Sequence, residues 1–517
     1  MHWIVIVIYG LALSFILAYS LVQLYLVVQY RRSRIGERRS VLYQESSITS
    51  PQSPLSTDLT AKVGESSIYN WPFVTVQLPV YNEKYVIERL LDCVSRLDYP
   101  KEKLEIQLLD DSTDDSFEIA KRKVAALRAK GLDIVHLHRT DRKGYKAGAL
   151  AEALSIAKGD LVTIFDADFL PNPDFLTQLI PYFDNPELGM VQTRWGHINR
   201  HHSLLTDLQA FGLDAHFSVE QGGRNAGKHF INFNGTAGIW RKACIEDSGG
   251  WSADTLTEDL DLSYRAQLKG WQFLFEEKVE APAELPAEMN ALKNQQYRWN
   301  KGAAECMRKN LPKVFANKQL PFSTKVNAVF HLMNSSIFLC VMVLTLLSVP
   351  LLWIKFKHPE LSTVFKLASI FLIALPILAI FYWTSEQKVV KKRPFWSFLI
   401  KFPAFLSVSM GLALHNAIAV GEGYLGIKTA FIRTPKFNLV DRERKKDWLK
   451  NSYLNRRISP LVILEIALAI YALFGIYLGI TLEDYGLIPF HLFLLFGFAY
   501  VAFTSIQHAL KIDHEMA

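Results

Sequence analysis

Carboxylates follow several of the apolar, β-branched runs in the first 300 residues of this 517-residue chain. Asp166 and Asp168 come directly after LVTIF, and Asp111 ends the run LEIQLLDD. Two carboxylates at positions i and i+2 after a strand can reach one divalent cation, and such a cation suits a diphosphate ligand. Acidic turns also cap helices. That simpler explanation is equally good for Asp111, but it is weaker for Asp166 and Asp168 because a buried-looking strand precedes them.

Three further polar motifs occur between residues 230 and 300. They are the small-residue turn Asn234, Gly235 and Thr236, the pair Glu258 and Asp259 after Thr257, and the set Gln295, Arg298 and Trp299. Taken singly, these motifs also fit a hairpin turn, carboxylates that favour a helix dipole, and a surface cation beside a packed indole. Their order and spacing together indicate a functional site.

The residues between 71 and 321 have the composition of a soluble domain. Runs typical of strands (74–80, 104–111, 133–139 and 161–168) alternate with runs typical of helices (83–97, 116–131 and 147–157). This alternation predicts an α/β domain, with a parallel sheet covered by helices on both faces. Ligands of such sheets bind at the carboxyl ends of the strands, so we expect the acidic motifs to meet there.

The overall composition excludes several classes of protein. Half of the residues are hydrophobic, which rules out disorder over most of the chain. The four cysteines are far apart, so a zinc ribbon and a disulfide scaffold are excluded. The net charge of +7 is modest, and we expect no nucleic-acid partner. His197, His201 and His202 lack a suitably spaced fourth ligand for zinc, and we expect them in a substrate groove or at the surface.

Long apolar runs predict a protein of a cell membrane, with the lipid bilayer as a partner. Residues 1–28 carry no charge and are too long for a signal-peptide core, so they predict an N-terminal anchor. Arg31, Arg32 and Arg34 place the following domain in the cytoplasm. Residues 29–70 resemble a flexible tether. Four more runs, 329–354, 367–383, 461–480 and 487–505, predict spans within a membrane region over 322–511.

One further apolar run, 396–420, is ambiguous. Its flanking segments 385–394 and 428–457 are both basic, so both should be cytoplasmic. We therefore predict an interfacial or re-entrant element; the alternative is an ordinary sixth span. Residues 421–458 would then form a cytosolic gating segment that carries FIRTPKF (431–437) towards the site. Glu465 lies inside a predicted span, where an ionisable group is functional, paired or snorkelling.

The motifs DDS, DAD, TED and QQYRW, in this order, resemble those of the processive family 2 glycosyltransferases, which include cellulose, chitin, hyaluronan and mannan synthases. The stretches QTRWGHINRHHSLLTDLQAFGLDAHFSVEQ and FINFNGTAGIWRKACIEDSGGW are similar to the cellulose-synthase-like group that contains the β-mannan and glucomannan synthases. The resemblance covers about residues 72–310 and extends more loosely to FIRTPKF. It is specific for fold and reaction type, but not for the sugar.

The resemblance implies a GT-A (Rossmann-like) catalytic domain, over 71–321, that feeds an α-helical transmembrane channel. It also implies a role for each matching position. Tyr81, Glu83, Asp111, Lys146, Asp166 and Arg298 would bind the nucleotide sugar; Asp166 and Asp168 would bind Mg²⁺ or Mn²⁺; Asp259 would be the general base; and Asn234, Gly235, Thr236, Glu258, Gln295 and Trp299 would bind the acceptor.

The expected reaction is an inverting transfer of a hexose from GDP-mannose or UDP-glucose to the growing end of a β-linked polysaccharide, coupled to export. Accessory export proteins are possible partners. Such a transfer needs one base for the acceptor hydroxyl and positive charge for the departing diphosphate. One alternative is the single glycosylation of a membrane lipid, as in a ceramide glucosyltransferase. Another is a transporter or scaffold without catalysis, which the presence of all four aspartates disfavours.

Overall fold

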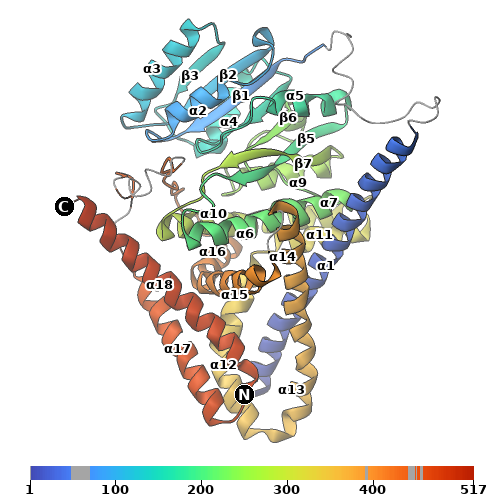
Figure 1. Cartoon of the computed structure of the whole chain (residues 1–517), viewed down its shortest axis with the longest axis vertical. Coiled ribbons are helices and arrows are strands. Elements are labelled where there is room, and N and C mark those ends of the chain that lie inside the picture. Colours follow the sequence, from blue (N-terminus) through green and yellow to red (C-terminus); the bar gives the residue numbers. More distant parts are fainter. Residues whose placement is uncertain are drawn as a thin grey trace.

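The computed structural model describes residues 2–47, 70–390, 394–439, 449, 451–454 and 458–516. A mixed α/β domain lies at one end of the molecule and a set of long apolar helices at the other (Figure 1). Several helices lie between these two parts. The chain therefore has the two regions that the composition predicts.

The α/β domain is built on a seven-stranded sheet with the order β3-β2-β1-β4-β6-β5-β7. The strands are β1 (Val74–Val80), β2 (Leu104–Asp110), β3 (Ile134–His138), β4 (Leu161–Ile164), β5 (Leu188–His197), β6 (Gly238–Arg241) and β7 (Gln272–Ala283). β1 pairs in parallel with β2 and with β4, so that Val74 lies opposite Leu104 and Leu161. The four strands predicted between 74 and 168 are all present, although β4 ends at Ile164.

The predicted strands, β1 to β4, are parallel as expected, whereas β6, which was not predicted, runs antiparallel to β4 and β5. Gly238, the first residue of β6, pairs with Ile164, the last residue of β4. The chain therefore begins β6 at the carboxyl edge of β4, directly after the Asn234–Gly235–Thr236 turn. No helix carries the chain back to the amino edge of β4 before β6 begins. β6 must therefore run antiparallel to β4.

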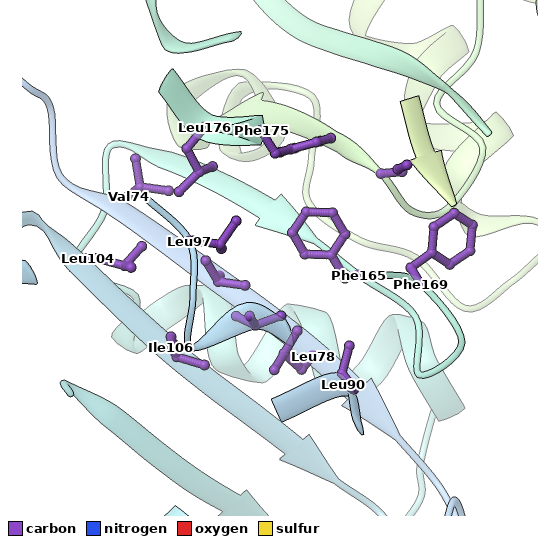
Figure 2. Close-up of a cluster of buried hydrophobic side chains, with 14 of the residues drawn as sticks. Val74, Leu78, Leu90, Leu97, Leu104, Ile106, Phe165, Phe169, Phe175 and Leu176 are labelled. Atoms are coloured by element: carbon purple, nitrogen blue, oxygen red, sulfur yellow. The ribbon is translucent and has the colours of Figure 1, made fainter. Parts of the chain in front are cut away.

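Helices cover both faces of the sheet. They are α2 (Ile87–Val94), α3 (Ser116–Ala129), α4 (Tyr145–Ile156), α5 (Phe175–Leu179), α8 (Lys242–Asp247) and α9 (Glu258–Leu268). Figure 2 shows one core cluster, in which Leu78, Leu90, Ile106 and Phe165 are buried between sheet and helices. A second cluster on the other face contains Leu150, Trp240 and Leu262. α2 is shorter than the predicted 83–97 because residues 84–86 and 95–96 form turns.

A layer of helices lies between the sheet and the apolar helices (Figure 1). It contains α6 (Leu204–Ala215), a π-helical turn (His216–Glu220), α7 (Gln221–Ala226), α10 (Met289–Ala316), α11 (Phe322–Leu332), α15 (Phe395–Gly411) and α16 (Ala413–Leu425). α10 packs against α11 and α16 and contacts α18. This layer connects the α/β domain to the rest of the molecule.

Among the described residues, five helical segments are long and apolar enough to cross a membrane. They are His2–Ile35, Ser336–Lys357, Pro359–Val389, Leu461–Thr481 and Tyr485–Lys511, and they lie in α1 (His2–Ser47), α12 (Ser336–Lys357), α13 (Ser362–Ala368) with α14 (Ala374–Val389), α17 (Leu461–Thr481) and α18 (Ile488–Met516). Each corresponds to one of the five predicted apolar runs, but the run predicted over 329–354 begins in α11 and reaches α12 only at Ser336. α1 continues to Ser47, so the first part of the predicted tether is helical, whereas residues 48–69 lie outside the described residues.

α15 and α16 are long and apolar enough to cross a membrane only when they are taken together. The two helices make a bend of 51° around Leu412. In Figure 1, α15 runs across the view whereas α14 runs down it. Such a bent pair is either a broken span or a re-entrant element. The prediction of an interfacial or re-entrant element for 396–420 and its alternative, a sixth span, therefore both stay open.

A buried ion pair joins α10 to the apolar helices. The Nζ atom of Lys293 lies 2.7 Å from Glu465 Oε1 on α17 and 3.0 Å from Ser505 Oγ on α18. Both charged side chains are almost completely buried. Of the roles considered for Glu465, the structure supports the paired one.

Candidate active site

Two adjoining cavities lie at the carboxyl ends of the central strands. The first, which we call the acidic cavity, has a volume of about 130 Å³ and is lined by Lys146, Asp166, Asp168, Glu258 and Arg298, among others. The second, which we call the deep cavity, has a volume of about 390 Å³ and continues between α6, α10, α11, α14 and α15. The residues that line both cavities are Trp195, Leu213, Asn234, Thr257, Asp259, Gln295 and Trp299.

Asp166 and Asp168 follow β4, and both line the acidic cavity. The Thr236 hydroxyl accepts a hydrogen bond from the Asp166 amide (3.0 Å), and Lys146 Nζ lies 2.5 Å from Asp166 Oδ1. Asp168 is buried and its Oδ2 accepts from Lys436 (2.6 Å), but its Oδ1 has no hydrogen-bond partner among the described residues. A buried carboxylate oxygen without a partner is costly, and a divalent cation would satisfy it.

The acidic cavity provides few protein ligands for such a cation. Among the described residues, no group of three or more His, Cys, Asp or Glu side chains could hold a metal ion. The two aspartates therefore fit a cation that takes its other ligands from a bound diphosphate and water, as is usual for Mg²⁺ at phosphate sites.

Lys146 lies in the first turn of α4 and is the cation closest to Asp166. Its Nζ also donates to the Gly235 carbonyl (2.9 Å). Burial lowers the pKa of Lys146, but the attraction of Asp166 and Glu258 outweighs burial and raises the pKa above its ordinary value. The ammonium group therefore remains charged at neutral pH.

Asp259 lies in the first turn of α9, where the two cavities meet. Removal from bulk water, and then repulsion by Glu258, raise its pKa to about 7. Burial also raises the pKa of Glu258. A carboxylate with a pKa near 7 can both accept and hold a proton at neutral pH, as a general base requires.

The turn at Asn234–Thr236 packs directly on Asp259. A Cβ atom on Gly235 would lie 3.1 Å from Asp259 Oδ2, and the φ angle of Gly235 is +80°. Only glycine adopts this backbone conformation easily and allows so close an approach. Thr236 itself is fully buried and supports Asp166 rather than lining either cavity.

The Q-x-x-R-W residues lie on α10, opposite the aspartates. Arg298 donates to the Ile432 carbonyl (2.5 Å), and its guanidinium lies 4.9 Å from the centre of the Phe431 ring. Burial lowers its pKa to about 10, so it remains a cation. The Trp299 ring lies 6.4 Å from Trp195, which contacts Phe217 in turn. These three aromatic rings form one wall of the deep cavity.

The FIRTPKF segment (431–437) extends across the acidic cavity. Arg433 binds both oxygens of Glu83 (3.1 and 2.7 Å), and Lys436 binds Asp168. Glu284 accepts from the Phe437 amide (2.8 Å) and so holds the end of the segment. Residues 421–425 of the predicted gating segment belong to α16. Residues 440–448, 450 and 455–457 of that segment lie outside the described residues.

Tyr81, Glu83 and Asp111 lie beside the two cavities, at the ends of β1 and β2. Asp111 accepts two hydrogen bonds from Arg139 (2.8 and 2.7 Å). Arg142 stacks over the Tyr81 ring at 3.3 Å. Glu83 is bound by Arg433 of the FIRTPKF segment. None of the three residues lines either cavity, and their contacts with a nucleotide stay a prediction.

Several residues of the site were not identified from the sequence. Trp195 and His216 line the deep cavity, Lys436 lines the acidic one, and Arg433 binds Glu83. Trp195 and His216 lie in stretches whose similarity to a known family was recognised, but no spacing distinguishes them from packing residues. FIRTPKF was identified as a segment, whereas the partners of its two cations depend on the tertiary structure.

The part of the chain that forms this site is similar to known proteins. A family model described as glycosyltransferase like family 2 matches residues 72–302. We call these residues the family 2 domain. The family 2 domain thus covers the sheet, both aspartate motifs, Asp259 and the Q-x-x-R-W residues, and the resemblance seen in the sequence is confirmed.

Two plant proteins are similar to this family 2 domain. The chain is 41% identical over 266 residues to glucomannan 4-beta-mannosyltransferase 2 of Arabidopsis thaliana, covering 50% of each protein. It is 39% identical over 266 residues to glucomannan 4-beta-mannosyltransferase 1 of Oryza sativa subsp. japonica, covering 50% of this chain and 51% of the relative. The chain thus spans about half the length of the curated relatives it matches.

One solved structure is a more distant match. It is a mannosyltransferase from Pyrobaculum calidifontis in complex with GDP-Man and Mn²⁺. The sequence identity is 19% and the TM-score 0.46, and the match covers 78% of this chain and 100% of the other.

Proposed function

We propose that this protein is an inverting hexosyltransferase that extends a β-linked polysaccharide from a nucleotide sugar, GDP-mannose or UDP-glucose. The observation that carries the proposal is the position of Asp259 between the two cavities. The acidic cavity has the charges that suit a nucleoside diphosphate, and the deep cavity has the aromatic and amide side chains that suit a glycan. A base at their junction touches both reactants.

The residues of this chain divide the chemistry between them. Asp259 takes the proton from the acceptor hydroxyl as that oxygen attacks the anomeric carbon. Arg298 and Lys146 bind the departing diphosphate, and the planar guanidinium of Arg298 can bind two oxygens at once. Trp299 packs on the apolar face of the acceptor sugar. Because attack comes from the face opposite the leaving group, an α-linked donor yields a β-linked product.

Asp166 and Asp168 would hold a divalent cation, Mg²⁺ or Mn²⁺. When bound, the cation supplies positive charge that stabilises the nucleoside diphosphate. The free Oδ1 of Asp168 supports this assignment. Lys436 occupies the other oxygen, so we expect FIRTPKF to move when donor and cation bind.

The course of the deep cavity supports a polymeric acceptor that leaves through the apolar helices. Its lining includes Gln209 on α6, Tyr382 on α14 and Ser409 on α15, far from the sheet. We propose that the product passes along this route, that the apolar helices span a cell membrane, and that the family 2 domain lies on the cytoplasmic side.

The test is a comparison of donors. Membranes that contain the full chain are incubated separately with GDP-mannose, UDP-glucose and UDP-N-acetylglucosamine, and any polymer is analysed for its linkages. Asp259→Asn membranes are the control. We expect a β-linked polymer from GDP-mannose or UDP-glucose and none from the control.

The alternative function is a single transfer to a membrane lipid, such as ceramide, and it has one observation in its favour. Apolar side chains, including Phe405, Val408 and Leu412, also line the deep cavity. A radiolabelled product that partitions into organic solvent and carries one sugar would support this alternative and contradict a polymeric product.

A further inference from the structure

A hydrogen-bonded row of polar side chains begins in the wall of the deep cavity, where His216 and Asn234 line it and the His216 ring lies 5.0 Å from the Phe217 ring. Its members are Glu220, His216, Asn234 and Gln221, and the first, second and fourth lie on the helical stretch 204–226. Asn234 belongs to the turn that packs on Asp259. The hydrogen bonds between these four residues determine which atom each side chain presents to its neighbour.

Gln221 sets the orientation of the Asn234 amide. Its Nε2 donates to the Asn232 carbonyl (2.8 Å) and to Asn234 Oδ1 (2.9 Å). A backbone carbonyl can only accept, so the atom of Gln221 at this place is the nitrogen. The atom of Asn234 that faces Gln221 must then be its oxygen, and Asn234 Nδ2 faces the other way.

His216 receives the other end of the Asn234 amide. Its Nε2 lies 3.1 Å from Asn234 Nδ2, and its Nδ1 lies 2.8 Å from Glu220 Oε2. Because the amide nitrogen donates, Nε2 must accept, and the ring proton must be on Nδ1 and donate to Glu220. Arg224 and His216 outweigh burial and hold the pKa of Glu220 far below its ordinary value, so Glu220 is a permanent acceptor.

His216 begins an irregular turn of the helix. His216–Glu220 is the one π-helical turn in the parts of the chain that the structure describes. Such turns within α-helices are frequent at functional sites. His216 also lines the deep cavity.

We propose that His216 is a positioning residue for the acceptor. Through its neutral Nδ1–H form it holds the Asn234 amide so that the second N–H of Nδ2, which has no partner among the described residues, donates to a hydroxyl oxygen of the acceptor sugar beside Asp259. The inference rests on the proposed function, because it assumes a glycan in the deep cavity. It assigns a hydrogen-bond donor for that glycan beside the aromatic wall.

Binding measurements test this role without requiring turnover. Isothermal titration calorimetry is carried out on the full chain in nanodiscs, with β-1,4-linked mannohexaose and cellohexaose as probes and GDP and UDP as controls. His216→Phe removes the acceptor for Asn234 while keeping a planar ring. His216→Gln keeps one donor and one acceptor but cannot be protonated. His201→Phe is the matched control, because His201 is an exposed histidine outside both cavities.

We expect His216→Phe to weaken oligosaccharide binding by about fivefold to tenfold, the effect of one lost hydrogen bond. His216→Gln should bind within about twofold of the wild type, and no variant should change nucleotide binding. If His216→Phe does not fold, Asn234→Asp, which replaces the donor with an acceptor, should show the same loss.

Three results would overturn the proposal: wild-type affinity in His216→Phe and Asn234→Asp, a loss in His216→Gln as large as in His216→Phe, or no binding of either oligosaccharide to the wild type. If the oligosaccharides bind as expected but the protein transfers sugar from none of the donors, the proposed function alone would be overturned.

Discussion

At the scale of single residues, the carboxyl group of Asp259 has a strongly raised pKa. Its pKa of about 7 means that the ionised, proton-accepting form dominates only above neutrality. We expect the rate at saturating donor to rise between pH 6 and pH 8, because only about a tenth of the base is ionised at pH 6. An aspartate with an ordinary pKa would produce no such rise.

Replacement of Asp259 tests the same residue directly. Asp259→Asn should lower the transfer rate by a factor on the order of 10²–10⁴ and leave nucleotide binding unchanged, because the diphosphate is bound by other residues. A variant that keeps more than about a tenth of the rate would show that Asp259 is not the base.

The stability of the Asn variant provides its folding control. A carboxyl whose pKa is raised in the folded state stabilises the protein when protonated, and that stability is lost between the pKa of the unfolded state, about 4, and the folded-state pKa of about 7. Asp259→Asn should therefore have a higher Tm than the wild type at pH 8 and a similar Tm at pH 4.

The free oxygen of Asp168 leads to a prediction about the cation. EDTA should abolish transfer, and Mg²⁺ or Mn²⁺ should restore it. In titrations of nucleoside diphosphate, Asp168→Ala should weaken binding by about tenfold or more, but only when the cation is present. The exposed Asp174→Ala is the control. Full activity in EDTA would leave Arg298 and Lys146 as the only partners of the phosphates.

At the scale of elements, α15 and α18 touch through glycines. A Cβ atom on Gly497 would lie 2.0 Å from the Ser407 carbonyl oxygen, and one on Gly411 would lie 2.2 Å from the Gly497 carbonyl oxygen. Small residues allow this close backbone contact between apolar helices. Neither helix can move away freely, because α18 also packs on α17.

Gly497→Ala should therefore lower the stability of the protein by about 1–3 kcal/mol, because the new methyl group has no room. The matched control is Gly421→Ala on α16, where a Cβ atom would meet nothing within 4 Å. That change should be neutral or stabilising, since alanine favours a helix. Thermal unfolding in detergent compares the two, and equal Tm values would mean that α15 and α18 do not pack in this way.

The bent pair α15–α16 raises a question of topology that labelling can answer. If the pair is interfacial or re-entrant, both of its ends lie in the cytoplasm. In a cysteine-free background, Lys428→Cys should then resist a membrane-impermeant maleimide applied to intact cells. Tyr485→Cys, in the exposed turn before α18, should react. Labelling at position 428 from outside would mean that the pair crosses the membrane, and the gating role of FIRTPKF would be abandoned.

At the scale of the whole molecule, the deep cavity is the feature that joins the family 2 domain to the apolar helices. α10 carries Arg298 and Trp299 into the site, while its Lys293 is fixed between α17 and α18. One helix thus connects Arg298 and Trp299 to the proposed exit route. On the proposed function, we expect a product longer than a few sugars to follow the cavity.

An obstruction of that route should shorten the product without preventing chemistry. Ser409 lines the deep cavity on α15, away from Asp259, and Ser409→Trp would fill much of the local space. We expect about a tenfold or greater loss of high-molecular-weight polymer, with short oligosaccharides in its place and unchanged nucleotide binding. The exposed Ser362→Trp should behave as the wild type. Long polymer from Ser409→Trp would exclude this route.

Much of this description follows from local sequence alone. The strands at 74–80 and 104–110 were predicted almost to the residue, because a buried strand is a short β-branched run between turns. The apolar runs and the acidic motifs were found for similar reasons, since hydropathy and the spacing of carboxylates are local properties. These features were sufficient to identify the family and to name Asp166, Asp168, Asp259 and Arg298.

The tertiary structure decided what depends on residues distant in sequence. The antiparallel direction of β6 follows from where the chain leaves the Asn234 turn, and the contacts of Lys436 with Asp168 and of Lys293 with Glu465 join residues 268 and 172 positions apart. The protonation pattern of His216 likewise depends on partners from two separate segments. Hydrogen-bond direction and pKa are set by neighbours in space, and spacing along the chain does not encode those neighbours.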